Sequence, residues 1–170
     1  MLQAYVRLAP PDTGIEHYER VAELPHFNPD LDGETAPPEV AGLRRAIASA
    51  DVLVISTPEY VHALPGAFKN ALDWLVSDPT FAGKPVVILH AARGSTWALD
   101  SLREILMTMS ARVIENAVVL LSLGSNQLDA DAILAREDLR TALHRSMAGL
   151  VAEMQLTPNQ ALEPSPRYQL

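Results

Sequence analysis

Residues 52–74 read VLVISTPEYVHALPGAFKNALDW, an aliphatic run followed by a proline-containing turn and an amphipathic segment. The run at Val52–Ile55 is typical of a strand that is buried on both faces of a parallel sheet. The strand is expected to stop at Pro58, because proline fixes its own φ and has no N–H for the ladder. The chain then turns out over the carboxyl edge of the sheet, which is where open α/β sheets bind ligands.

A helix is predicted to follow this turn. Pro65 and Gly66 open it, since proline is well tolerated in the first turn of a helix. Apolar side chains then recur at helical spacing, and polar ones fall on another face. The apolar set is Leu64, Phe68, Ala71, Leu72 and Leu75, and the polar set is Lys69, Asn70 and Asp73. The loop Glu59–Ala63 is therefore expected to be held between two rigid elements.

Strands and helices alternate along the rest of the chain. Apolar periodicity predicts helices over residues 1–8, 38–49, 97–109 and 131–154, and strands over residues 15–21, 85–91 and 113–123. The 15–21 segment is polar and is expected at a sheet edge. This alternation predicts a three-layer α/β sandwich with a parallel sheet, for which a flavodoxin-like fold is the obvious choice. We expect one domain over residues 1–156, and a tail over residues 157–170 that is loose or lies across a partner.

Composition supports one globular domain and excludes several classes of function. The chain has 170 residues, of which 48% are hydrophobic, and a formal charge of −8. This charge, without any cluster of Lys or Arg, argues against nucleic-acid binding. The absence of cysteine excludes disulfides, thiolate nucleophiles and cysteine-ligated metals. The apolar runs are too short to span a bilayer and no secretion signal is visible, so no membrane partner is expected and the cytoplasm is the expected compartment.

Three segments, in the same order, resemble the NADPH-dependent FMN reductase family. They are LAPPDTGIEHYERVAELPHFNPDLD at residues 8–32, TPEYVHALPGAFKNALDWL at residues 57–75 and HAARGSTWALDSLREIL at residues 90–106. The Pro-Glu-Tyr and Pro-Gly-x-x-Lys-Asn-x-x-Asp-Trp combination is far more specific than a lone glycine motif. The resemblance runs to about Met154 and implies a flavodoxin-like fold with bound FMN. In that family FMN takes a hydride from NADPH and passes electrons to a small-molecule acceptor such as a flavin, a quinone, an azo dye or a metal oxyanion.

The resemblance also implies which residues bind the cofactor. They are Pro58, Glu59, Tyr60 and Val61 in the first loop, and Ala92, Arg93 and Gly94 in the second. The backbone amides of Glu59, Tyr60 and Val61 would face the polar edge of the isoalloxazine, where negative charge grows on reduction, and no side chain need be catalytic. Without the resemblance, Pro58–Tyr60 merely ends a strand.

The resemblance further implies a homodimer or tetramer. In that picture the helix face from Lys69 to Trp74 packs on a second subunit, and an exposed Trp74 would favour this arrangement.

The chain departs from the family pattern at three places. Family members begin with a strand and a Ser- and Arg-containing phosphate loop, whereas Met1 here falls inside the first helix, so both are expected to be absent. The family's Asn after Pro-Glu-Tyr is Val61. The glycine-rich loop after the next strand is reduced to AARGSTW at residues 91–97, in which Trp97 crowds the ring or stacks on it.

The absent strand is central in the flavodoxin topology, so its loss has to be compensated. One possibility is that the 15–21 strand lies beside residues 52–56, which gives a four-stranded sheet in the order 2-3-4-5 of the family's strands. The alternatives are that the recorded start is wrong or that the chain is a truncated product.

Two further sets of residues are candidates for chemistry. Arg93–Thr96 precedes a helix and could hold a flavin or nicotinamide phosphate, although Ser95 or Thr96 is more simply the N-cap of that helix. His62 and His90 fall at the ends of adjacent strands, where they could donate protons to a reduced quinone or bind a metal. Two histidines without a third ligand are usually polar surface, and no metal site is expected.

We therefore expect an FMN-dependent NAD(P)H oxidoreductase that acts on a small-molecule acceptor. A different class stays open, namely a cofactor-free or truncated α/β protein that acts through its dimer or partner surface. A third possibility is an oxidoreductase that has exchanged FMN for a nucleotide lacking the phosphate contact.

Overall fold

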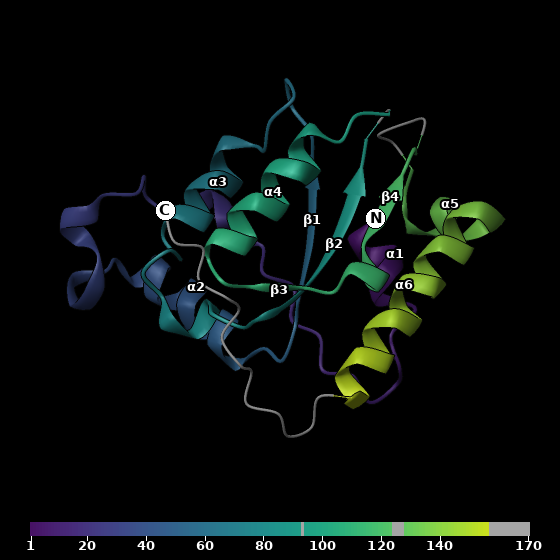
Figure 1. Ribbon diagram of the computed structural model, residues 1–170, viewed down its shortest axis with the longest axis horizontal. Coiled ribbons are helices and arrows are strands. Elements are labelled where there is room, and N and C mark those ends of the chain that lie inside the picture. The colour runs from purple at the N-terminus through teal and green to yellow at the C-terminus, as the bar shows by residue number, and fades with distance from the viewer. Residues whose placement is uncertain (93, 124–127, 157–170) are drawn as a thin grey trace.

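This computed structural model describes residues 1–92, 94–123 and 128–156. They form a parallel β-sheet with helices on both faces (Figure 1). Its strands are β1 (Leu53–Pro58), β2 (Pro85–Ala91), β3 (Arg112–Val113) and β4 (Val119–Leu121). Each of the other three strands pairs with β2 in parallel. The predicted four-stranded parallel sheet is confirmed, although its members differ from those expected.

Helices cover the sheet in two layers (Figure 1). One layer holds α2 (Pro38–Ser49), α3 (Gly66–Asp73) and α4 (Trp97–Thr108), and the other holds α1 (Leu2–Val6), α5 (Ala130–Ala135) and α6 (Glu137–Leu156). The three-layer prediction is confirmed. None of the described helices combines the length and apolar content that crossing a membrane requires.

Strand β2 supplies the centre of both hydrophobic cores. Val87 and Leu89 point to the core shared with α1, α5 and α6, whereas Val86 and Ile88 point to the core shared with α2, α3 and α4. All four side chains are fully buried. A strand buried on both faces carries a continuous aliphatic sequence, which is why this strand and its parallel neighbour could be predicted.

The strand predicted at residues 15–21 is wrong. This segment contains no strand, and it leads into a short 3-10 helix at Arg20–Glu23. Its apolar side chains, Tyr18 and Val21, are followed by Leu24, and all three pack on the α2–α4 side. A spacing of three suits a turn rather than the alternation of a strand. Strand β1 is therefore at the edge of the described sheet, and the order 2-3-4-5 is also wrong.

The long strand predicted over residues 113–123 is interrupted. A 3-10 turn, η5 (Glu115–Ala117), separates β3 from β4. Helix α6 packs directly on this turn, because Ser146 Oγ donates a hydrogen bond to the carbonyl of Ala117. The polar pair Glu115 and Asn116 thereby leaves the ladder, and α6 is brought against the backbone.

The last predicted helix, over residues 131–154, is two helices. Arg136 separates them, since its ψ of 117° is extended. Its guanidinium pairs with Asp138 at the start of α6. The tail over residues 157–170 lies outside the described residues, so the division at residue 156 stays a prediction.

Gly149 lies where α6 passes close to the backbone of η5. A Cβ at this position would lie 2.8 Å from the backbone oxygen of Asn116, so Gly149→Ala requires backbone movement. We expect the free energy of unfolding to fall by about 1–3 kcal/mol, as for other overpacked sites. Gly42→Ala, inside α2, is the matched control, because its Cβ would meet only the end of the Arg45 side chain at 4.0 Å. That substitution should raise stability by about 0.5–1 kcal/mol in urea denaturation. Equal effects of the two substitutions would contradict the close contact.

Candidate functional site

The first loop is a tight turn in a strained conformation. β1 ends at Pro58 as predicted, and Tyr60 and Ala63 then exchange two backbone hydrogen bonds of 3.0 Å each. The two residues between them, Val61 and His62, have φ of 51° and 59°. This is the geometry of a type I′ turn, which Asn and Gly adopt readily and a β-branched residue rarely does. Val61 is also 97% exposed, so the structure gains no packing from holding valine there.

The second loop lies beside the first because β1 and β2 are in register. Pro58 is paired with Ala91 at the carboxyl end of the sheet. Ala92 N–H then donates to the carbonyl of Leu121 at 3.1 Å, and Gly94 has a φ of 95° that glycine adopts without strain. Arg93 lies outside the described residues.

Glu59 joins the two loops with its side chain. One carboxylate oxygen, Oε1, accepts a hydrogen bond from Ser95 Oγ. The other, Oε2, accepts one from the backbone N–H of Ala98 at 2.9 Å, in the first turn of α4. The Glu59 side chain is only 8% exposed. A residue singled out for its backbone thus acts through its carboxylate as the cap of a helix 39 positions further on.

This cap bears on the phosphate interpretation of Arg93–Thr96, of which Arg93 lies outside the described residues. Thr96 is the N-cap residue by position, but its hydroxyl donates to Asp100 Oδ2 at 2.8 Å. The Glu59 carboxylate therefore occupies the place at the start of α4 where an external anion would bind. The hydrogen bonds from Ala98 and Ser95 lower the pKa of Glu59 below its ordinary value, against the opposing effect of burial.

The two candidate histidines have different environments, so they do not act as a pair. His90 is fully buried beneath the start of α4, with Nε2 3.4 Å from the carbonyl oxygen of Ser95 and Nδ1 without a hydrogen-bond partner among the described residues. His62 is exposed at the tip of the turn, 3.4 Å from Glu59 Oε1. Within the described ranges, no cluster of three or more His, Asp or Glu side chains is arranged to hold a metal ion.

Large apolar side chains surround the two loops. Tyr60 and Val61 project from the first loop and Trp97 opens α4, and all three are more than half exposed. The His62 ring meets Trp97 edge-on, with ring centroids 5.9 Å apart. The carboxyl edge of the sheet therefore carries a hydrophobic and aromatic rim of the kind that planar ligands contact.

Trp74 is buried, against the exposure that would favour a subunit interface. Its Nε1–H donates to the carbonyl of Pro25 at 2.8 Å, and Phe27 packs edge-on against its ring. Asn70 binds the same segment through Pro25 O and Phe27 N. Asn70 and Trp74 of the quoted motif therefore hold residues 24–28 onto α3.

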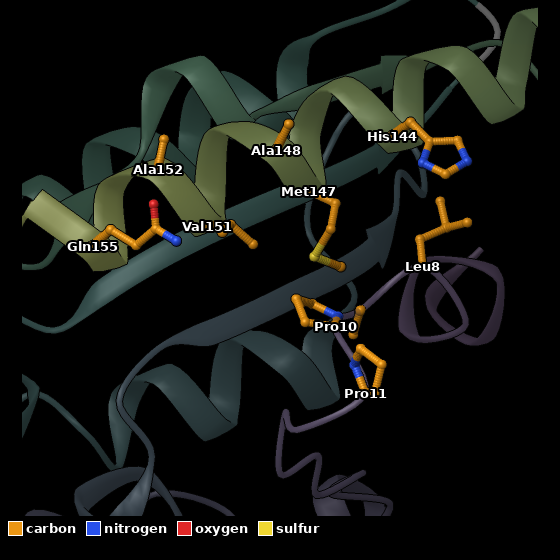
Figure 2. Close-up of a pocket in the computed structure, with 10 residues that line it drawn as sticks. Leu8, Pro10, Pro11, His144, Met147, Ala148, Val151, Ala152 and Gln155 are labelled. Carbon is orange, nitrogen blue, oxygen red and sulfur yellow. The ribbon is translucent and has the colours of Figure 1, made fainter.

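A groove on the other helical layer lacks the carboxylate and the large aromatic side chains found at the two loops (Figure 2). It has a volume of about 530 Å³ and lies between α6 and the turn after α1. In Figure 2 Met147 points from α6 toward Pro10, and His144 is the one titratable side chain among the residues that line the groove. No residue of the two loops contributes to it.

The sequence profile of the NADPH-dependent FMN reductases matches residues 1–126. The chain belongs to this family. It is 32% identical over 154 residues to an NAD(P)H-dependent FMN reductase of Pseudomonas aeruginosa, which covers 88% of this chain and 83% of that protein. It is 33% identical over 129 residues to a quinone reductase of Escherichia coli, covering 72% and 69%. A 2-hydroxy-1,4-benzoquinone reductase of a Burkholderia species is 32% identical over 155 residues, covering 86% and 82%.

A solved structure shares this fold. FerB, a flavoenzyme NAD(P)H:acceptor oxidoreductase of Paracoccus denitrificans, superimposes with a TM-score of 0.71 at 25% identity, covering 91% of this chain and 87% of its own. The flavodoxin-like prediction is confirmed. This protein is therefore an FMN-dependent NAD(P)H oxidoreductase, with FMN as cofactor and NAD(P)H as electron donor.

The described loop residues fit the ring of FMN. The amides of Val61 and His62 enter no backbone hydrogen bond within the described chain, so they are available to ring oxygens, whereas the amide of Tyr60 is already bound inside the turn. Within the described part of the two loops, residues 58–63, 92 and 94–96 include no Lys or Arg. When bound, FMN supplies the hydride and electron transfer.

Glu59→Gln tests the link between the loops through its pH dependence. A carboxyl whose pKa is lowered on folding stabilises the protein above its unfolded pKa, about 4.3 for Glu, and loses that contribution as pH falls. We expect the variant to melt at a lower temperature than the parent near pH 7 and the two melting curves to converge toward pH 3. Asp73→Asn, which breaks the exposed pair with Lys69, is the control. A melting difference that is independent of pH would contradict the carboxylate cap.

Val61→Asn tests the strain in the turn. Asn tolerates the left-handed region better than valine does. Because the valine side chain is exposed, its replacement removes no packing from the protein. We expect a gain of about 1 kcal/mol in the free energy of unfolding of the cofactor-free protein. Ala63→Asn, at an exposed position without positive φ, should change stability by less than about 0.5 kcal/mol. A destabilised Val61→Asn variant would show that the turn is not strained.

Proposed function

We propose that this reductase holds the isoalloxazine of FMN between the Pro58–Ala63 turn and the loop containing Ala92, Arg93 and Gly94, and reduces quinones with electrons from NAD(P)H. The observation that carries the proposal is the convergence of two loops at the carboxyl edge, joined by the buried Glu59 carboxylate. A linked pair of loops fixes the backbone at the position where open α/β sheets bind ligands.

The class of acceptor follows from the exposed side chains around the two loops. Tyr60, Val61 and Trp97 are exposed there, and they favour a flat, partly apolar molecule over a strongly hydrated anion. The named quinone reductases of Escherichia coli and Burkholderia support the same class of acceptor. We extend it to free flavins, which are also planar.

A homodimer in the cytoplasm is part of the proposal. On α3 the solvent-exposed residues left for a partner are Gly66, Ala67 and Lys69, and Val76 is exposed just beyond the helix. Val76→Asp should shift the protein toward monomers in analytical ultracentrifugation. If the parent is a dimer and the Val76→Asp variant has the same sedimentation coefficient, the interface does not involve α3.

The test of the site is an FMN titration followed by quenching of flavin fluorescence. Replacing Pro58 by Ala together with Tyr60 by Gly loosens the turn, so we expect the Kd for FMN to rise about tenfold, which is 1.4 kcal/mol of binding free energy. Pro79→Ala is the control, because Pro79 begins a 3-10 turn before β2, at the opposite edge of the sheet. Circular dichroism checks that the fold is retained. Equal affinity in the double variant would place the ring elsewhere, and no binding by the folded parent would overturn the proposed site.

A further inference from the structure

We propose that His62 donates a proton to the acceptor during its reduction, with Glu59 and Trp97 as the positioning residues that orient its ring. The inference rests on the proposed function, to which it adds the source of one proton. The tight turn accounts for the backbone conformation of His62, and the helix cap accounts for the Glu59 carboxylate. Neither of them requires an imidazole side chain at position 62.

His62 is oriented by contacts from two elements. Its Nδ1 lies 3.4 Å from Glu59 Oε1, and its ring meets Trp97 at an interplanar angle of 71°. A carboxylate at Nδ1 favours the tautomer that carries the proton on this nitrogen. The other nitrogen, Nε2, is left to exchange protons with a ligand or with water, and the side chain is 70% exposed. An acid–base histidine is commonly arranged in this way, with one ring nitrogen facing a carboxylate and the other open to the ligand.

In the described part of the chain, the charged and titratable groups packed around Glu59 have other partners or no access to a ligand. The second oxygen of Glu59 accepts from Ala98 N–H and lies 4.0 Å from His90 Nε2. His90 comes from β2 and is fully buried, so it cannot exchange protons with a ligand above the loops. Asp100, in the first turn of α4, accepts from the Thr96 hydroxyl.

Quinone reduction needs a group of this kind. Two electrons and two protons convert both carbonyl groups of the quinone to hydroxyls. The hydride equivalent that originates from NAD(P)H brings both electrons and one proton. The second proton passes from Nε2–H of the His62 imidazolium to the quinone oxygen on which negative charge develops. This leaves His62 neutral with its remaining proton on Nδ1, and water then reprotonates Nε2. General acids placed in this way contribute about 10²–10⁴-fold to a rate.

The experiment compares two acceptors in the FMN-loaded protein. p-Benzoquinone takes up protons, whereas ferricyanide accepts one electron without a proton. For His62→Gln we expect the ratio of kcat/KM for p-benzoquinone to that for ferricyanide to fall at least tenfold. His17→Gln is the matched control, because His17 is an exposed histidine 3.1 Å from Glu19 and far from the loops in sequence. It should leave the ratio unchanged.

A second readout needs no cofactor. In the cofactor-free protein at alkaline pH, the ¹⁵N chemical shifts of the His62 ring should report the tautomer protonated on Nδ1, and Glu59→Gln should shift it toward a mixture. An unchanged acceptor ratio in His62→Gln, with both acceptors still reduced, would overturn the proton transfer and leave the proposed function standing. Loss of FMN binding in the parent would instead overturn both. A ring that is protonated on Nε2 in the parent would overturn the orientation by Glu59.

Discussion

The parallel pairing of β1 with β2 is the constraint on which the rest of the molecule depends. It runs in register from Leu53 opposite Val86 to Pro58 opposite Ala91. Because β2 is buried on both faces, this pair organises the two cores and thus all the helices. Because both strands end at the same level, it also sets the two loops side by side. A shift of one residue would turn the alternating aliphatic side chains to the wrong cores and separate the loops.

Glu59 turns this proximity into a defined site. A carboxylate that is 8% exposed would be costly without partners, and here it receives a hydroxyl and a backbone N–H while lying at the positive end of α4. These interactions lower its pKa and keep it ionised at neutral pH. The ionised carboxylate also faces His62 Nδ1. One buried group therefore both joins the two loops and orients the exposed imidazole.

Local patterns could be predicted from the sequence, and long-range contacts could not. The helix Pro38–Ser49 and the strand Pro85–Ala91 match their predictions, because apolar periodicity depends on neighbouring residues. The 15–21 strand failed because Tyr18, Val21 and Leu24, which are three residues apart, pack together on one side, and the sequence alone did not show which residues share that core. The cap by Glu59 joins residues 36 and 39 positions apart, and Trp74 is covered by a segment 49 positions away. The turn at Val61 and His62 goes against residue preference, so propensity could not have found it.

The charge of the protein bears on how such a site can work at all. FMN and NAD(P)H are anions, while the chain has a formal charge of −8. A free carboxylate on the loop proposed to hold the cofactor would repel both, yet Glu59 is the one acidic residue of the Pro58–Ala63 turn. Its charge is directed inward, toward Ser95 and the amide of Ala98, and the outer surface is left to Tyr60, Val61, His62 and Trp97. The loop thereby presents backbone N–H groups, aromatic rings and an imidazole to a ligand, so binding at the ring does not require positive side chains in the described part of the two loops.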